Sequence, residues 1–241
     1  MLRKCLFVVL ALCLVGAGRG WAKPAFGIRG GLNMANASVK PKEWRLYEGE
    51  PGVPFDVKST LGVVIGEVIE FPLTETKQTA FILRLEGLYV QKGFKESPSK
   101  EEPGYEYEAT WAVDELVLAP FAVLRIPMQG VTPFVQAGPE LGIRISGVVK
   151  VEETYPDYEG VSHSETDKSY LENWSHTNFG LNIGGGVAVP AGKGEVVFDV
   201  RYNLGLTNMH TYKEEPGEED TTVKTNGIQI MVGYNFSIPT K

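Results

Sequence analysis

Cysteine is almost absent from this chain of 241 residues. The two cysteines, Cys5 and Cys13, both lie within the first 22 residues. If that segment is removed on export, the remaining chain can form no disulfide, no thiolate metal site and no cysteine nucleophile. Histidine is also scarce, at three residues, and there is no run of basic residues. With a formal net charge of −7, the chain is a poor candidate for binding nucleic acid.

Beyond residue 22, the chain has no apolar segment long enough to form a transmembrane helix. The longest apolar stretch covers residues 116–124, and Pro120 interrupts it. A helix needs about 20 apolar residues to cross a bilayer. There is no long amphipathic helical pattern either, whereas glycine is abundant at 28 residues. These features favour an all-β protein.

The first 22 residues have the three parts of an export signal. Basic residues precede an apolar run of 13 residues, and small residues at Gly20 and Ala22 suit cleavage after Ala22. The run is too short to cross a bilayer as a helix. We therefore predict a signal peptide over residues 1–22 and an outer-membrane β-barrel domain over residues 23–241. A retained membrane anchor is the alternative.

The rest of the chain alternates apolar and polar residues with a period of two, which is the pattern of β-strands with different surroundings on their two faces. In the segment 79–92, Phe81, Leu83 and Leu85 share one face, and Arg84 and Glu86 share the other. The alternation predicts eight strands, at residues 26–36, 61–71, 79–92, 111–126, 132–148, 175–189, 195–208 and 226–238.

The connections between these segments alternate in length. They are long after the first, third, fifth and seventh strands and short after the others, and most of the long ones are acidic. This asymmetry is typical of outer-membrane barrels, which have short periplasmic turns and long outer loops. We therefore predict an all-β fold, an eight-stranded antiparallel up-and-down transmembrane β-barrel. It would lie in the outer membrane of a Gram-negative bacterium after cleavage of the signal.

Charged residues of both signs fall on the polar face, which would point into the lumen. The interior of an eight-stranded barrel is only wide enough for side chains. Charges buried there must pair and hydrogen-bond with one another. We therefore predict a closed lumen with a structural charge network made of Arg29, Glu70, Arg84, Glu86, Glu140, Arg144, Asp199 and Arg201.

Alternation alone also fits a soluble lipocalin-like barrel that binds a small molecule. The loop asymmetry and the lumenal charges favour the membrane version, because a lipocalin interior would hold few ionised groups. Aromatic residues near strand ends also suit the girdles of a membrane barrel. They are Phe26, Phe71, Trp111, Trp174, Tyr234 and Phe236.

Four segments resemble the outer-membrane protein β-barrel domain family that includes the PorT-like proteins. They are GIRGGLNMAN (27–36), LEGLYVQKGFK (85–95), TPFVQAGPELGIRISG (132–147) and NFGLNIGGGVAVPAGKGEVVFDVRYNLGLTNM (178–209). They occur in the family's order. The resemblance implies outer-membrane lipid and the barrel-assembly machinery as partners, and it suggests envelope or secretion proteins as partners of the loops.

The chain departs from the family's pattern in three places. The fourth strand of the family usually carries a glutamate before an apolar residue and a proline, but here Leu118, Ala119 and Pro120 form the triplet. Glu67 falls on the apparent lipid-facing side of the second strand, which leaves the register there open. The aromatic residue that suits barrel assembly, Phe236, is followed by five further residues.

No pattern in the chain predicts a catalytic or metal site. The three histidines, His163, His176 and His210, could bind a metal together with nearby acids, but their spacing matches no ligand pattern. Residues 162–165 contain serine, histidine and glutamate, yet the members of a catalytic triad are seldom neighbours in sequence. The glycines at 184–186 fit a strand better than a phosphate loop, because no helix or lysine follows.

We therefore predict a non-enzymatic protein without cofactor or metal, with a closed charge-filled lumen, acidic surface loops and a structural or interaction role in the cell envelope. The resemblance adds one alternative, a PorT-like accessory of a protein-secretion system. Since some eight-stranded outer-membrane barrels modify lipids, a lipid-modifying enzyme is a further alternative.

Overall fold

The computed structural model describes residues 24–44, 53–76, 78–99, 106–155, 161–167, 174–211 and 221–236. Within these ranges no helix is long and apolar enough to cross a bilayer. The predicted signal peptide lies outside the described residues. The strands are β1 (Ala25–Lys40), β2 (Glu43–Trp44), β3 (Val53–Glu75), β4 (Ala80–Pro98), β5 (Glu106–Arg125), β6 (Thr132–Tyr155), β7 (Val161–Asp167), β8 (Thr177–Ala191), β9 (Gly194–Gly205) and β10 (Thr222–Phe236).

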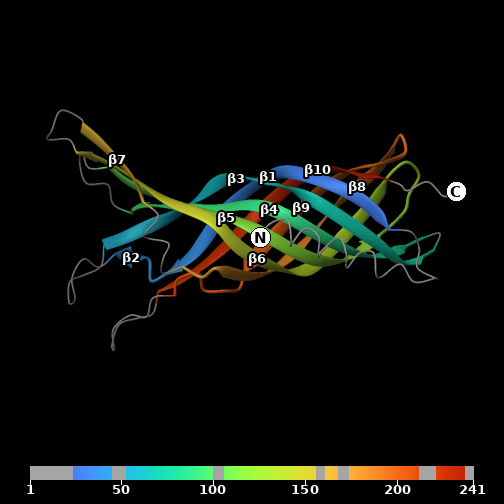
Figure 1. The fold of residues 1–241 in the computed structure, drawn as a ribbon, viewed down its shortest axis with the longest axis horizontal. Coiled ribbons are helices and arrows are strands. Elements are labelled where there is room, and N and C mark those ends of the chain that lie inside the picture. Colours follow the sequence, from blue (N-terminus) through green and yellow to red (C-terminus); the bar gives the residue numbers. More distant parts are fainter. Residues whose placement is uncertain are drawn as a thin grey trace.

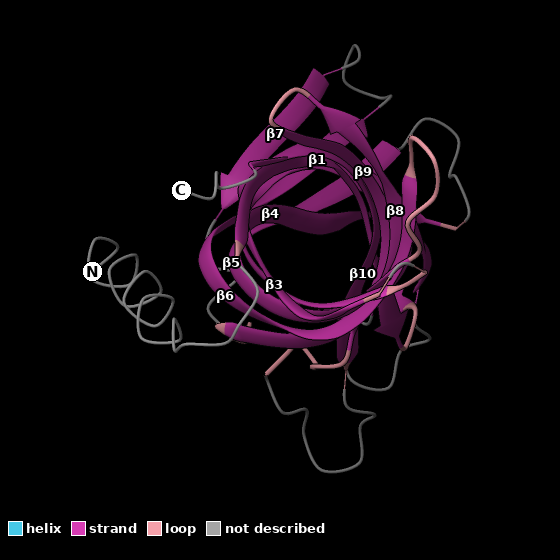
Figure 2. Cartoon of the chain, turned by 90° about the vertical axis from the view of Figure 1, so that its right-hand side faces the viewer, coloured by secondary structure: helices cyan, strands magenta, loops and turns pink. Residues whose placement is uncertain are grey.

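Eight of these strands close into a barrel. The order of hydrogen-bonded neighbours is β1-β10-β9-β8-β6-β5-β4-β3, and pairing of β3 with β1 completes the ring. Every pair is antiparallel, and neighbours in the ring follow one another in the sequence. Figure 2 shows the ring almost end on. The predicted eight-stranded up-and-down barrel is therefore confirmed.

The two ends of the barrel differ. One end, here called the turn end, carries the short connections β3–β4, β5–β6 and β8–β9. Strand β1 begins at this end, and strand β10 ends there. Gly130 and Gly192 lie in two of these connections with φ of 80° and 62°. Glycine adopts such angles without the steric cost that a Cβ would bring. The opposite end, the loop end, carries the longer connections and the short strands β2 and β7 (Figure 1).

Several strands continue further toward the loop end than predicted. β3, β4, β5 and β6 contain 23, 19, 20 and 24 residues, whereas β8, β9 and β10 contain 15, 12 and 15. A tilted strand crosses a bilayer in about 9–11 residues. The four long strands therefore extend well past the membrane-spanning part at the loop end (Figure 1), where they stay paired with one another.

The two short strands correct the prediction that residues 37–60 and 150–173 form loops. β2 pairs with β3, and β7 pairs with β6. β6 continues through residues 149–155, where β-branched residues favour a strand. Val149 is buried in this part of the strand, whereas Lys150 and Glu152 are exposed.

The outer surface of the barrel is apolar around its middle. Large side chains on this surface are about half exposed, including Ile28, Leu32, Val135, Ile183 and Val200. A barrel folded for water would carry such residues inside. The outward position of these residues is the arrangement that a surrounding bilayer requires.

Candidate functional site: the barrel interior

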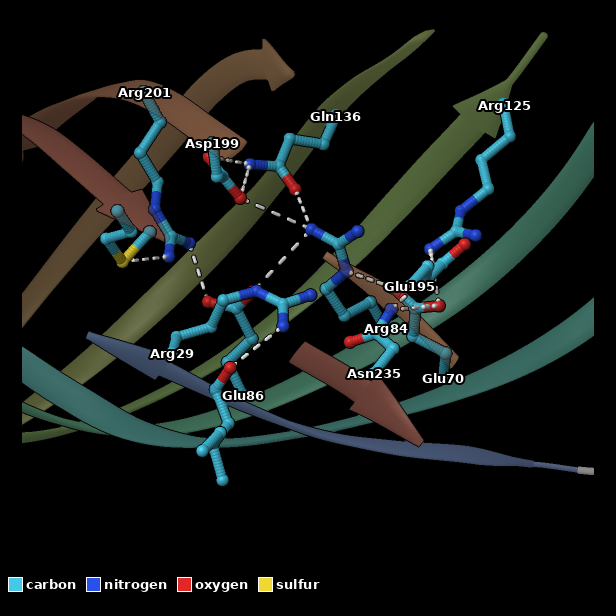
Figure 3. Close-up of polar contacts among 12 residues, drawn as sticks. Arg29, Glu70, Arg84, Glu86, Arg125, Gln136, Glu195, Asp199, Arg201 and Asn235 are labelled. Atoms are coloured by element: carbon cyan, nitrogen blue, oxygen red, sulfur yellow. Dashed lines mark hydrogen bonds and ion pairs between the residues drawn. The ribbon is translucent and has the colours of Figure 1, made fainter. Parts of the chain in front are cut away.

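The turn half of the barrel interior contains a network of buried charged side chains centred on Arg84 of β4 (Figure 3). Its Nε donates to Glu70 Oε1 at 2.8 Å, and its Nη1 donates to Gln136 Oε1 at 2.5 Å and to Asp199 Oδ2 at 3.4 Å. Glu86 Oε1 lies 3.7 Å from the same Nη1. One guanidinium group thus connects side chains of β3, β4, β6 and β9.

Glu70 extends this network toward the turn end. Its Oε2 accepts a hydrogen bond from Arg125 Nη2 at 2.8 Å, and Arg125 also forms an ion pair with Glu195 at 2.6 Å. Asn235 Nδ2 donates to Glu195 Oε1 at 2.7 Å and to Glu70 Oε2 at 3.3 Å. Both oxygens of Glu70 are therefore bound by donors from β4, β5 and β10.

Arg201 of β9 forms a second link across the lumen. Its Nη1 lies 2.7 Å from Glu86 Oε2, and its guanidinium group lies 4.9 Å from the ring centroid of Phe121. Its Nη2 donates to the sulfur of Met231 at 3.2 Å. Arg29 is buried beside this pair, where its Nη1 donates to the carbonyl of Ile28 at 3.0 Å.

Positive and negative groups balance in this set, which we call the arginine network. Charges withdrawn from water are tolerated when they are paired and hydrogen-bonded. The arginine network holds four arginines and four carboxylates, namely Arg29, Arg84, Arg125 and Arg201 with Glu70, Glu86, Glu195 and Asp199.

A smaller group lies further toward the loop end, around Lys92 of β4. Its Nζ lies 2.7 Å from Glu140 Oε1 and 3.0 Å from Glu115 Oε2. Asn182 donates to Glu140 at 2.8 Å, and Asn178 donates to Glu115 at 3.1 Å. The two carboxylates share a single cation, Lys92, and each of them also accepts a hydrogen bond from an asparagine amide. We call these five residues the Lys92 group.

Aromatic side chains fill the interior at the loop end, so the expectation that Trp111 and Trp174 belong to an outer girdle was wrong. Phe94, Trp111 and Trp174 stack nearly parallel, with ring centroids 5.1–6.2 Å apart. Trp111 Nε1 donates to Glu96 at 3.2 Å. We call this the aromatic cluster, and the other buried members are Ala37, Val39, Phe55, Val113, Val149, Met209 and Val223.

A comparison of the sequence with models of protein families identifies the family of this chain. The model of the outer membrane protein beta-barrel domain matches residues 22–211. The chain belongs to this family. The predicted resemblance is thereby confirmed at the level of the barrel domain, and the PorT-like subgroup stays a prediction. A search of the curated proteins returned no match for this chain.

Solved structures of outer-membrane proteins resemble this barrel at low sequence identity. Neisserial surface protein A is 13% identical, with 90% of this chain and 100% of that chain covered and a TM-score of 0.42. OprG from Pseudomonas aeruginosa is 12% identical, covering 91% and 99%, with a TM-score of 0.40. Ail of Yersinia pestis is 13% identical, covering 89% and 100%, with a TM-score of 0.33.

The eight residues predicted to fill the lumen of this outer-membrane barrel are not all in one place. Six belong to the arginine network, and Glu140 belongs to the Lys92 group. Arg144 lies at the edge of the Lys92 group, opposite Glu115 in the pairing of β5 with β6. It is only partly buried, and its Nη2 lies 2.9 Å from His176 Nδ1 near the loop end.

Several charged residues of the interior were missing from the predicted set. The alternation of apolar and polar residues nevertheless indicated some of them. Glu115 alternates with the outward-facing Leu116 and Leu118, so strict alternation alone would have placed it inside. Arg125 and Glu195 lie next to short turns, where alternation ends and residues are easily assigned to the connection. Leu118, which stands where the family usually has a glutamate, faces outward, whereas Glu115 of the same strand is buried in the interior.

The residues considered for chemistry show no assembled site in the part of the chain that is described. No group of three or more histidine, cysteine, aspartate or glutamate side chains there could hold a metal ion. Residues 162–165 belong to β7, but the structure does not describe their side chains. The acidic run 218–220 also lies outside the described residues. The glycines at 184–186 are part of β8, where added Cβ atoms would meet Val200 O at 2.4 Å and Phe198 O at 1.9 Å.

Proposed function

We propose that this protein is a non-enzymatic outer-membrane barrel with a closed lumen and a structural or interaction role in the cell envelope. The observation that carries the proposal is the pairing of charged side chains across the lumen. β4 and β9 lie opposite each other in the ring of eight strands. Arg201 of β9 nevertheless contacts Glu86 of β4 at 2.7 Å, and Arg84 contacts Asp199 at 3.4 Å.

Contacts between opposite walls support a lumen that is closed to water at the level of the arginine network. Phe121 and Phe134 pack against two of its guanidinium groups and exclude water further. Closer to the loop end, the Lys92 group and the aromatic cluster fill the interior at two further levels. Three successive layers of side chains support a closed barrel rather than a diffusion channel.

The surface that remains for an interaction lies at the loop end, beyond the apolar part of the barrel. The long strands present polar side chains to water there, such as Asp56, Lys58, Lys150 and Glu152. The hydrogen bond from Lys150, together with its charge, lowers the pKa of the Glu152 carboxyl below its ordinary value. A rigid, charged extension of this kind suits contact with other components of the envelope.

The first experiment is heat modifiability of the protein from fractionated cells. We expect a faster-migrating band in the unboiled sample, and only in the outer-membrane fraction, because a closed membrane barrel resists detergent until it is boiled. A single unchanged band in the soluble periplasmic fraction would contradict the proposal and point to a soluble binder.

Two measurements test the finer parts of the proposal. In planar bilayers, the purified protein should produce no stable conductance steps, and reproducible steps would show that the lumen is open.

Lipid A from cells with and without the protein should have the same mass, and a mass difference would indicate a lipid-modifying enzyme.

A further inference from the structure

Three lysines and a threonine form one row across the outward faces of the four long strands, beyond the apolar surface. Lys58 of β3 pairs directly with Lys95 of β4. Lys95 also pairs with Thr110 of β5, which in turn pairs with Lys150 of β6. The neighbours of each lysine along its strand include members of the aromatic cluster or residues packed against it, so the lysines themselves point outward. We call these four residues the lysine row.

Two members of the lysine row, Lys58 and Lys95, are like charges directly opposite each other. Such cross-strand partners have Cβ atoms about 4.5–5.5 Å apart, and like charges in this arrangement are destabilising. Lys95 has an ion pair with Glu108, whereas Lys58 has no hydrogen bond or ion pair with any described residue. An anion in contact with both ammonium groups would relieve the repulsion between them.

Acidic side chains on the same outward faces lie one row further from the apolar surface. Asp56 lies two residues beyond Lys58 toward the loop end, and Glu152 lies two residues beyond Lys150. Glu108 pairs with Glu152 and so belongs to the same row. The charges are thus separated by height, because the cations lie on the side of the bilayer and these acids lie on the side of the water.

The lysine row lies within reach of the bilayer surface. Lys58 is three residues beyond Leu61, and Lys150 is five residues beyond Ile145, and both of these apolar side chains are exposed. A strand tilted by 35–45° climbs about 2.5 Å per residue, which places the two lysines about 8–13 Å beyond the apolar surface. Lysine side chains lay their apolar stems along such a surface and place the charge in the polar layer. The row therefore borders the lipid headgroups.

We propose that the lysine row binds the phosphate groups of lipid headgroups in the outer leaflet. This inference rests on the proposed outer-membrane barrel with its loop end outside. Ammonium groups and a hydroxyl supply hydrogen-bond donors, and lysine is a common ligand of phosphate. Free phosphate has the same chemistry, but the position of the row beside the bilayer selects the lipid. Asp114 lies between the row and the apolar surface, where its carboxyl group interacts with Tyr89.

Native mass spectrometry of the detergent-solubilised protein with added lipid A tests the chemistry of the site. We expect diphosphorylated lipid A to bind, and the same lipid without its phosphates to bind at least about tenfold more weakly. An excess of inorganic phosphate should not displace the lipid. Equal binding of the two lipids would overturn the proposal. Displacement by inorganic phosphate would overturn it as well, because the ligand would then be free phosphate.

Two double variants test the position of the site by the same measurement. Lys58→Gln with Lys95→Gln should weaken the binding of lipid A roughly thirtyfold, since each lysine near an anionic headgroup contributes about a fivefold change. The matched control is Lys193→Gln with Lys224→Gln, which removes the same charge at opposite ends of the barrel and should leave binding nearly unchanged. Equal losses for the two double variants would contradict the proposal.

The heat-induced band shift shows whether each variant still folds, so a lost lysine contact can be told from a lost barrel. A wild-type protein that shows the band shift in the outer-membrane fraction but binds no lipid A would refute the lysine-row site alone. A wild-type protein without the band shift would instead refute the proposed membrane barrel.

Discussion

The two halves of β4 carry the same alternation with opposite polarity. Near the turn end, Leu83 and Leu85 face outward and the buried Arg84 faces inward. Near the loop end, Lys95 faces outward and the buried Phe94 faces inward. The strand keeps its period of two while the medium outside changes from hydrocarbon to water. The outward-facing residues follow the surrounding medium, whereas the interior of β4 holds both classes of side chain, with Leu88 and Val90 buried between Glu86 and Lys92.

Strands β3 and β6 change register where these two levels meet. Phe55 and Val64 of β3 are nine residues apart, yet both are buried inside, because an irregularity in the pairing with β4 lies between Ser59 and Val64. Glu140 and Val149 of β6 are also nine residues apart and both buried, with an irregularity opposite Asp114 and Glu115. A β-bulge reverses the faces of a strand, and these two separate the membrane-spanning level from the aqueous one.

The largest effect is expected from Arg84→Met in the membrane-spanning level. The change leaves Glu70 and Asp199 buried with one fewer cationic partner, and breaking a buried ion pair in this way costs about 3–5 kcal/mol. We expect a loss of about 4 kcal/mol in the free energy of unfolding, measured by urea titration in phospholipid vesicles. Arg144→Met, at the partly exposed position, is the control and should cost at most about 1 kcal/mol. Equal losses for the two variants would refute a special role for the arginine network.

A somewhat smaller effect is expected from Lys92→Met, at the boundary between the levels. Glu115 and Glu140 would share a buried site without their cation, although Asn178 and Asn182 would still donate to them. We expect a loss of about 3 kcal/mol by the same titration. Adding Glu115→Gln to the Lys92→Met variant should recover part of that loss, because it removes one unpaired carboxylate. Without such recovery, the loss would have to come from packing rather than charge.

Phe94→Ala should affect the aqueous level alone. It removes a ring that stacks on both Trp111 and Trp174, and truncation of a buried phenylalanine costs about 3 kcal/mol. We expect faster amide hydrogen exchange in residues 53–59 and 94–98, while the heat-induced band shift stays. If the whole barrel lost its band shift, the two levels would have to unfold as one unit.

The sequence predicted those parts of the fold in which alternation is strict. On β4, the inward positions of Arg84 and Glu86 follow directly from the apolar residues between and beside them. The second predicted strand began eight residues too late, at 61 instead of Val53, because the bulge near Ser59 interrupts the alternation. Similarly, the fifth strand was expected to end at 148, close to the second bulge, whereas β6 continues to Tyr155.

The partners within the lumen could not be derived from the sequence. Alternation assigns Glu86 to the interior, but it gives no reason to pair Glu86 with Arg201 of β9 rather than with a residue of an adjacent strand. That choice depends on the tilt and stagger of the strands, which are properties of the closed barrel. The same limit explains why Arg144 was placed with the arginine network, since strand position does not specify height along the lumen.

The smallest effect is expected from Lys95→Met on the aqueous level of β4. Lys95 is three residues from Lys92 on the opposite face, and it pairs with Glu108 of β5 where both side chains are about one-third exposed. Exposed ion pairs contribute about 0–1 kcal/mol, so we expect a loss below about 0.5 kcal/mol in the urea titration. Raising the salt concentration should remove even this difference, because salt screens exposed charges. A loss comparable to that of Lys92→Met would mean that this face is buried and would contradict its assignment to water.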